Sequence, residues 1–235
     1  MITDKQIKAF ENKINYKFQN KQLLRQALTH SSFSNERKMS KLENNERIEF
    51  LGDAVLELVT SHFLFENYPK LPEGELTKLR ASIVCEPTLS ECAKDLQLGQ
   101  YILLGKGEEL SGGRARNSVL SDVLEAVIGA IYLDSGLDEV RTFIKNIILT
   151  DIENKKLFYD SKTVLQEIIQ QNSQVPLQYR LIEEKGPDHN KEFVVEVIFE
   201  EKVLGIGKGR SKKMAEQEAA YKAIKSIQNH QNKSM

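Results

Sequence analysis

Residues 45–65, NERIEFLGDAVLELVTSHFLF, contain the strongest structural signal in the chain. Apolar residues recur there at three- and four-residue spacing, which predicts a long amphipathic helix. At about 100° per residue, four carboxylates fall within roughly 80° of one another on one helix face: Glu46, Glu49, Asp53 and Glu57. An ordinary surface helix would place lysines four residues from these acids, whereas here only Arg47 interrupts them. The acidic stripe is therefore self-repelling.

Gly52 lies in the middle of the same predicted helix. A glycine in a helix interior costs roughly 1 kcal/mol relative to alanine. Because glycine has no side chain, it lets another backbone or a partner approach the helix closely at that point.

A second acidic pair lies on an otherwise apolar helix predicted over residues 118–133, SVLSDVLEAVIGAIYL. Asp122 and Glu125 are its only charges, and their spacing of three residues places both on one face. Burying two carboxylates without a cation is expensive. Two sources of positive charge remain open, namely pairing with Arg114 or Arg116, and a hard divalent metal ion with oxygen ligands. A carboxylate cluster that keeps several waters suits Mg²⁺, whose usual chemistry is on phosphoryl groups.

The chain changes character near Tyr159. Residues 1–150 show helical spacing and predict an all-α domain. The polar residues 151–159 predict a linker, with Leu157, Phe158 and Tyr159 as the residues able to dock it. Residues 160–228 predict a small α+β domain with the order α-β-β-β-α. Residues 229–235 predict a polar, frayed tail.

Composition excludes several classes of protein. Lys and Arg total 33 against 34 Asp and Glu, so a net charge of −1 gives no global basic field for nucleic-acid binding. No apolar run approaches the roughly 20 residues of a membrane-spanning helix, and the N-terminus lacks the pattern of a secretory signal. Cys85 and Cys92 fit neither a redox C-x-x-C motif nor a zinc knuckle. We therefore expect a cytoplasmic protein without a membrane span.

Positive charge is local in the second domain, where four basic residues fall close together: Lys208, Arg210, Lys212 and Lys213. We expect Ser211 to cap the closing helix there, so that lysines and free backbone N–H groups converge on a spot that suits a phosphate. Two further polar patches are Gln166 and Glu167 on the first helix, and the turn GPDHN at 186–190. Double-stranded RNA is read by shape over about 16 base pairs, through two minor grooves and the phosphates between them. Three separated polar patches suit that geometry.

The stretch ERIEFLGDAVLEL at 46–58 resembles the signature of bacterial ribonuclease III, with Ile48 where a leucine is usual and Ala54 where a serine is common. Further blocks resemble the same catalytic domain in the same order: THSSFSNE at 29–36, EGELTKLRASIV at 73–84 and SDVLEAVIGAIYLDSG at 121–136. Three later segments look like the contact regions of a double-stranded-RNA-binding domain: DSKTVLQEIIQ, GPDHNKEF and GKGRSKKMAEQEAA. The resemblance extends from about residue 5 to residue 227.

The resemblance implies roles for individual residues. Metal ligands are implied at Glu49, Asp122 and Glu125, and catalytic roles at Glu125 and at Asp53, which would hold metal-bound water. Phe50 falls on an aromatic residue that enters a socket on the partner subunit. Minor-groove contacts are implied at Gln166, Glu167, Pro187, Asp188 and His189, and phosphate contacts at Lys212 and Lys213. Glu46 and Glu73 fall on acidic positions of the substrate groove or near the dimer interface.

The implied activity is magnesium-dependent hydrolysis of phosphodiester bonds in double-stranded RNA by a homodimer, with Mn²⁺ able to substitute. The implied products carry 5′-phosphate and 3′-hydroxyl ends with short 3′ overhangs. Implied substrates are ribosomal RNA precursors and other structured transcripts, and no small-molecule cofactor is implied.

Two alternatives belong to other classes. One is a protein that only binds double-stranded RNA, and the other is an RNA-associated homologue that uses the dimer fold as a scaffold. Neither needs Glu49, Asp53, Asp122 and Glu125 together, and this chain retains all four. Their retention favours the enzyme.

Overall fold

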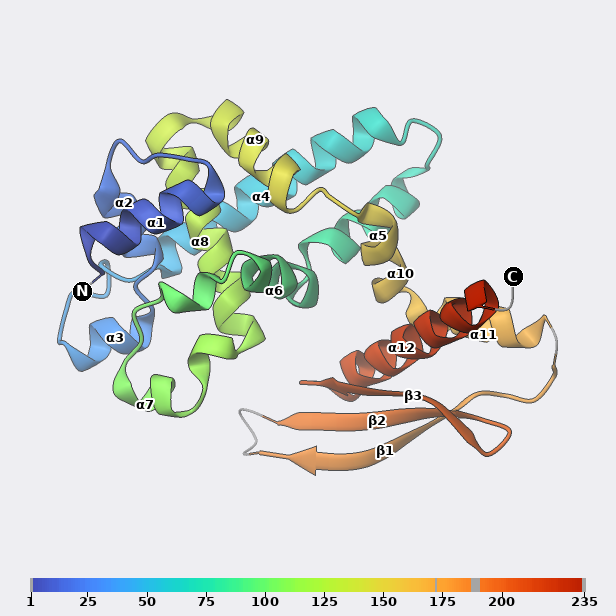
Figure 1. The fold of residues 1–235 in the computed structure, drawn as a ribbon. Coiled ribbons are helices and arrows are strands. Elements are labelled where there is room, and N and C mark those ends of the chain that lie inside the picture. The colour runs from blue at the N-terminus through green and yellow to red at the C-terminus, as the bar shows by residue number, and fades with distance from the viewer. Residues whose placement is uncertain (1, 172, 187–190, 234–235) are drawn as a thin grey trace. The chain divides into compact units, whose positions relative to one another are not determined.

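The acidic stripe lies on one continuous helix, α4 (Glu46–Asn67), in the computed structural model, which describes residues 2–171, 173–186 and 191–233 (Figure 1). α4 packs along α8 (Asn117–Ser135), which is buried along most of its length. Leu56 of α4 and Leu124 of α8 are fully buried in the same core. The two helices predicted from apolar spacing are therefore confirmed.

Shorter helices surround this pair and complete an all-α unit, Met1–Ile152. They are α1 (Asp4–Ile14), α2 (Lys21–Ala27), α3 (Ser31–Glu36), α5 (Glu73–Val84), α6 (Glu86–Asp95), α7 (Lys106–Leu110) and α9 (Leu137–Ile147), with 3-10 turns η1 (Leu98–Gln100) and η2 (Gly113–Ala115). In the described part of this unit, the only extended pairing is an isolated bridge between Thr29 and Leu103. No described helix is both long and apolar enough to cross a membrane.

The second unit, Glu153–Met235, contains a three-stranded antiparallel sheet in the order β1-β2-β3. Its elements are α11 (Ser161–Gln170), β1 (Gln178–Lys185), β2 (Glu192–Phe199), β3 (Lys202–Gly209) and α12 (Lys212–Lys233). Val197 of β2 lies in a core with Leu165 of α11 and Ala219 of α12, so both helices pack on one face of the sheet. The predicted α-β-β-β-α order is confirmed.

Three alternate glycines of β3 allow α12 to lie directly on the strand. A Cβ atom at Gly209 would be 2.6 Å from the backbone nitrogen of Ala215, and Gly205 and Gly207 are equally crowded by α12. As expected, Ser211 caps the helix, because its Oγ accepts a hydrogen bond from the backbone N–H of Met214 at 3.2 Å. This packing fixes the place where the basic residues at the start of α12 emerge.

The structure differs from the sequence prediction at residues 151–159 and 229–235. The predicted linker contains a helix, α10 (Ile152–Tyr159), and the predicted tail continues α12 as far as Lys233. Polarity suggested a linker, and Leu157 and Phe158, two of the residues able to dock it, pack within the second unit.

Several contacts attach α10 to α12. The ring of Phe158 lies 5.2 Å from that of Tyr221 in an edge-to-face arrangement. Lys225 Nζ donates a hydrogen bond to Asn154 Oδ1 at 2.6 Å, and Gln217 Nε2 donates to the carbonyl oxygen of Tyr159 at 2.8 Å. From Glu153 onward, α10 is therefore part of the second unit.

We expect this attachment to protect Lys155 and Lys156 of α10 from trypsin in the native protein. Phe158→Ala removes the ring contact and should speed cleavage at these lysines about fivefold or more, because proteolysis follows the population of locally opened chains. Tyr159→Ala, a neighbouring aromatic truncation at an exposed position, should leave the rate unchanged. Mass spectrometry of the tryptic fragments over time measures both cleavage rates. Immediate cleavage of the unsubstituted protein at these lysines would show that α10 is a free linker.

Candidate metal centre

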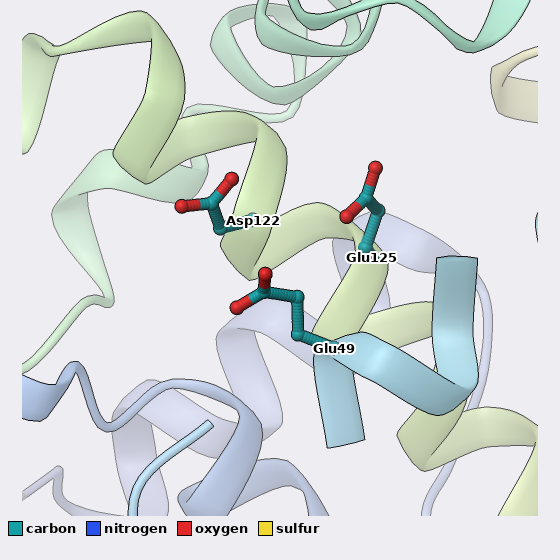
Figure 2. Close-up of side chains that lie close together, drawn as sticks. All are labelled: Glu49, Asp122 and Glu125. Carbon is teal, nitrogen blue, oxygen red and sulfur yellow. The ribbon is translucent and has the colours of Figure 1, made fainter. Parts of the chain in front are cut away.

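Three carboxylates from α4 and α8 gather around one space (Figure 2). Glu49 comes from α4, and Asp122 and Glu125 come from α8. One oxygen atom of each lies within 4.8 Å of the others, and all three residues are half-buried. The predicted ligand set is thus brought together from segments more than 70 residues apart in sequence.

The remaining acids of the stripe lie at different places around this group. Asp53 and Glu46 are exposed, yet both act electrostatically on Glu49. Glu57 is instead paired with Arg80 of α5, whose Nε lies 2.8 Å from its carboxylate. Arg80 therefore neutralises the stripe at its Glu57 end.

Burial, together with repulsion between neighbouring carboxylates, raises the pKa values of two ligand candidates in the metal-free protein. Burial, followed by repulsion from Asp122, Glu46 and Asp53, raises the pKa of Glu49 to about 7. Burial, followed by repulsion from Asp53, Asp122 and Glu49, raises the pKa of Glu125 to about 8. A cation entering this space would relieve the repulsion and displace these protons.

The two arginines considered as ion-pair partners of the acidic pair on α8 form ion pairs with other carboxylates. Arg114 forms an ion pair with Glu109 and also donates to the carbonyl oxygen of Ile102 at 3.0 Å. Arg116 forms an ion pair with Glu108. These contacts favour the second source of positive charge, a metal ion.

The donor set fits a hard divalent ion. The described group contains carboxylate oxygens and neither histidine nor cysteine, and its residues are partly open to solvent. Mg²⁺ and Mn²⁺ prefer oxygen ligands, and Mg²⁺ keeps several waters. Glu49, Asp122 and Glu125 are the residues that would hold such an ion.

Phe50 follows Glu49 directly but points away from the core. Its side chain is 79% exposed, and Leu58 and Phe65 of the same helix are 57% and 75% exposed. Residues 50, 54 and 58 are each four apart and share one helix face. Contiguous exposed apolar residues often form interaction surfaces, so this row is a candidate contact surface.

The other predicted positions lie on elements other than α4 and α8. Glu73, at the start of α5, is exposed and accepts a hydrogen bond from Thr77 Oγ1 at 3.1 Å. Exposed positions on α11 and at the start of α12 carry the predicted RNA contacts Gln166, Glu167, Lys212 and Lys213. The predicted contacts Pro187, Asp188 and His189 lie outside the described residues.

Sequence reasoning did not single out His30, which lies within electrostatic range of the acidic group. Its Nδ1 accepts a hydrogen bond from the backbone N–H of Ser32 at 3.2 Å and caps α3. Burial lowers the pKa of His30, although the carboxylates of Glu108 and Asp122 act in the opposite direction. The block THSSFSNE contained this residue, but nothing in its spacing connected it to α8.

Two family models match the chain. One, described as Ribonuclease-III-like, matches residues 20–152, and the other, described as a double-stranded RNA binding motif, matches residues 161–227. The first match lies within the helical unit and the second within the sheet-containing unit, and residues 153–160 lie between the two matches.

Relatives match almost the whole chain. Ribonuclease 3 of Bacillus licheniformis is 51% identical over 230 residues, which are 97% of this chain and 92% of that protein. Ribonuclease 3 of Oceanobacillus iheyensis is 50% identical over 225 residues, 95% of this chain and 99% of that protein.

A solved structure is similar to the helical unit. The nuclease domain of ribonuclease III from Campylobacter jejuni has a TM-score of 0.57 and 46% identity, covering 60% of this chain and 95% of that one. That structure is described as showing structural flexibility in a region involved in dimer formation. Together with the family models and the full-length relatives, this similarity establishes that the chain belongs to the ribonuclease III family.

Proposed function

We propose that this chain is a magnesium-dependent endoribonuclease that hydrolyses phosphodiester bonds in double-stranded RNA. The observation that carries the proposal is the three-carboxylate group of α4 and α8, held in one chain with a unit that matches a double-stranded RNA binding motif. A protein that only binds RNA has no use for half-buried carboxylates that repel one another.

The carboxylates of the site have two roles, which are to hold the metal ion and to orient water. Glu49, Asp122 and Glu125 would hold the ion, Mg²⁺ or Mn²⁺, and Glu49 and Glu125 would give up protons on binding it. When bound, a divalent ion supplies a Lewis acid that activates water and stabilises a leaving oxygen. Asp53, exposed and one helical turn after Glu49, orients water from the open side of the site. Cleavage of the bond to the 3′ oxygen gives 5′-phosphate and 3′-hydroxyl ends, and no small-molecule cofactor takes part.

Substrate binding is assigned to the second unit. Lys212 and Lys213 contact phosphates at the capped start of α12, and Gln166 and Glu167 of α11 contact a minor groove. The substrates that fit these contacts are duplex regions of structured transcripts in the cytoplasm, ribosomal RNA precursors among them.

A homodimer formed through α4 completes the proposal. The exposed apolar row that includes Phe50 begins one residue after Glu49, so a second copy seated there lies next to the acidic group. Two such groups on a symmetric dimer cut both strands of one duplex. Staggered cuts leave short 3′ overhangs.

Glu125→Gln tests the enzyme directly, because it removes a charge and hardly changes shape. Cleavage of a long RNA duplex with Mg²⁺ should fall by about a hundredfold or more, beyond the 10–100-fold typical of residues that only support metal ligands. Duplex binding, measured by fluorescence anisotropy, should stay within about twofold. Glu75→Gln, at an exposed position on α5, is the matched control. Activity near that of the unsubstituted protein, or activity that survives a chelator, would contradict the metal assignment.

The raised pKa values of Glu49 and Glu125 predict how pH affects stability without metal. A carboxyl group whose pKa is raised on folding favours the folded state most below its unfolded pKa, near 4.5, and this contribution is lost as pH rises toward about 7 and about 8. The melting temperature of the metal-free protein should therefore fall between pH 5 and pH 8.

Differential scanning fluorimetry measures this fall, which Glu125→Gln should reduce. Both groups are partly exposed. At pH 8 the unsubstituted protein should therefore be less stable than Glu125→Gln by on the order of 1 kcal/mol, which lowers its melting temperature by about 2–4 °C. Adding Mg²⁺ at pH 8 should stabilise the unsubstituted protein and leave Glu125→Gln unchanged. Equal pH slopes for the two proteins would refute the electrostatic account.

Phe50→Ala tests the dimer. Truncating a central interface aromatic usually costs about 2 kcal/mol or more, so the dimer dissociation constant should rise at least about tenfold. Leu110→Ala, at an 89% exposed position on α7, should leave it unchanged. Sedimentation velocity over nanomolar to micromolar concentrations measures both constants. A dimer of unchanged strength would remove Phe50 from the interface.

A further inference from the structure

The backbones of α4 and α8 touch where the helices cross. A Cβ atom added to Gly52 of α4 would overlap the carbonyl oxygen of Glu125 and lie 2.9 Å from the backbone nitrogen of Gly129. A Cβ atom added to Gly129 of α8 would overlap the carbonyl oxygen of Ile48 and lie 3.1 Å from the backbone nitrogen of Gly52. The two glycines therefore face each other across one contact.

This contact cannot be relieved by side-chain rotation, because the crowded atoms include backbone atoms on both helices. Packed helices usually lie about 8–10 Å apart with side chains between their axes. An alanine at Gly52 must therefore push the helices apart. Without that neighbour the same change would favour α4 by roughly 1 kcal/mol, so the glycine is retained against helix propensity.

The contact lies next to the acidic group. Glu49 precedes Gly52 by three residues on α4, and Glu125 precedes Gly129 by four residues on α8, each about one helical turn. The carbonyl oxygen that Gly52 approaches belongs to Glu125 itself. Because Glu49 comes from one helix and Asp122 and Glu125 from the other, the distance between the helices sets how far Glu49 lies from the other two (Figure 2).

We propose that Gly52 and Gly129 are positioning residues whose backbone contact sets the spacing of Glu49 from Asp122 and Glu125, and thereby selects a small cation. The inference rests on the proposed metal-dependent function. Mg²⁺ demands near-octahedral geometry at about 2.0–2.1 Å, whereas Ca²⁺ accepts oxygen ligands at about 2.3–2.6 Å in flexible geometry. If the two helices move apart, the affinity of the site for Mg²⁺ should therefore fall more than its affinity for Ca²⁺.

The experiment compares Gly52→Ala with two controls in the full chain. Gly74→Ala, on α5, adds a Cβ with no neighbour within 4 Å. Val140→Ala, at a fully buried position on α9, weakens the core away from the crossing. Isothermal titration calorimetry without RNA measures Mg²⁺ and Ca²⁺ binding to each protein.

Gly52→Ala should weaken Mg²⁺ binding by about tenfold or more and Ca²⁺ binding by less than about threefold, because only Mg²⁺ requires the narrow geometry. Both controls should keep the Mg²⁺-to-Ca²⁺ ratio of the unsubstituted protein, although Val140→Ala lowers the melting temperature. If Gly52→Ala kept the Mg²⁺-to-Ca²⁺ affinity ratio of the unsubstituted protein, whether or not both affinities fell, the positioning role would be overturned. Gly129→Ala should repeat the shift in ratio. If neither glycine variant folds, even with a stabilising osmolyte, the contact is a folding requirement and the proposal fails.

A metal-free measurement separates this inference from the proposed function. Crystal structures of metal-free Gly52→Ala and of the unsubstituted protein should show Glu49 farther from Glu125 in the variant. If the unsubstituted protein binds neither ion, the proposed function fails while this distance still tests the spacing. If the distance is unchanged, the glycine contact does not set it.

Discussion

Carboxylates that share one partly buried space repel one another and lose hydration, and the first unit is organised to withstand both effects. The raised pKa values of Glu49 and Glu125 record that cost in the metal-free protein. The burial of apolar side chains on α8 offsets this cost, because Val123, Leu124 and Val127 are fully buried. Because core burial does not depend on the charge of the site, the helices can hold the acids in place before any cation arrives.

Two arginines of the helical unit join neighbouring segments. Arg80 joins α5 to α4 through Glu57 and Ser61, at 2.8 Å and 2.9 Å. Arg114 ties the segment after α7 to carbonyl oxygens of Gly99 and Ile102. Arg80 and Arg114 thus pair with Glu57 and Glu109, which are not members of the three-carboxylate group.

Spacing within one element predicted much of this arrangement, and contacts between elements account for what it did not predict. The periodicity of α4 and α8 identified the acids that gather, because a helix fixes which residues share a face. It did not reveal that Arg80 neutralises Glu57, since residues 57 and 80 lie on different helices. The helical form of residues 152–159 was not predicted, although docking of Leu157 and Phe158 was anticipated, because the residues that cover them belong to the second unit. Roles for Pro187, Asp188 and His189 remain predictions.

The attachment of α10 has a consequence for dissecting the protein into fragments. A fragment that begins at residue 161, where the double-stranded RNA binding motif starts, loses the ring that covers Tyr221 and the carbonyl group that Gln217 binds. A fragment that ends at Asp160 carries Leu157 and Phe158 without the surface that buries them, and exposed apolar residues promote aggregation. The cut that leaves both pieces with their own packing falls between Ile152 and Glu153. Affinities or melting temperatures measured on shorter pieces would describe a frayed version of the unit.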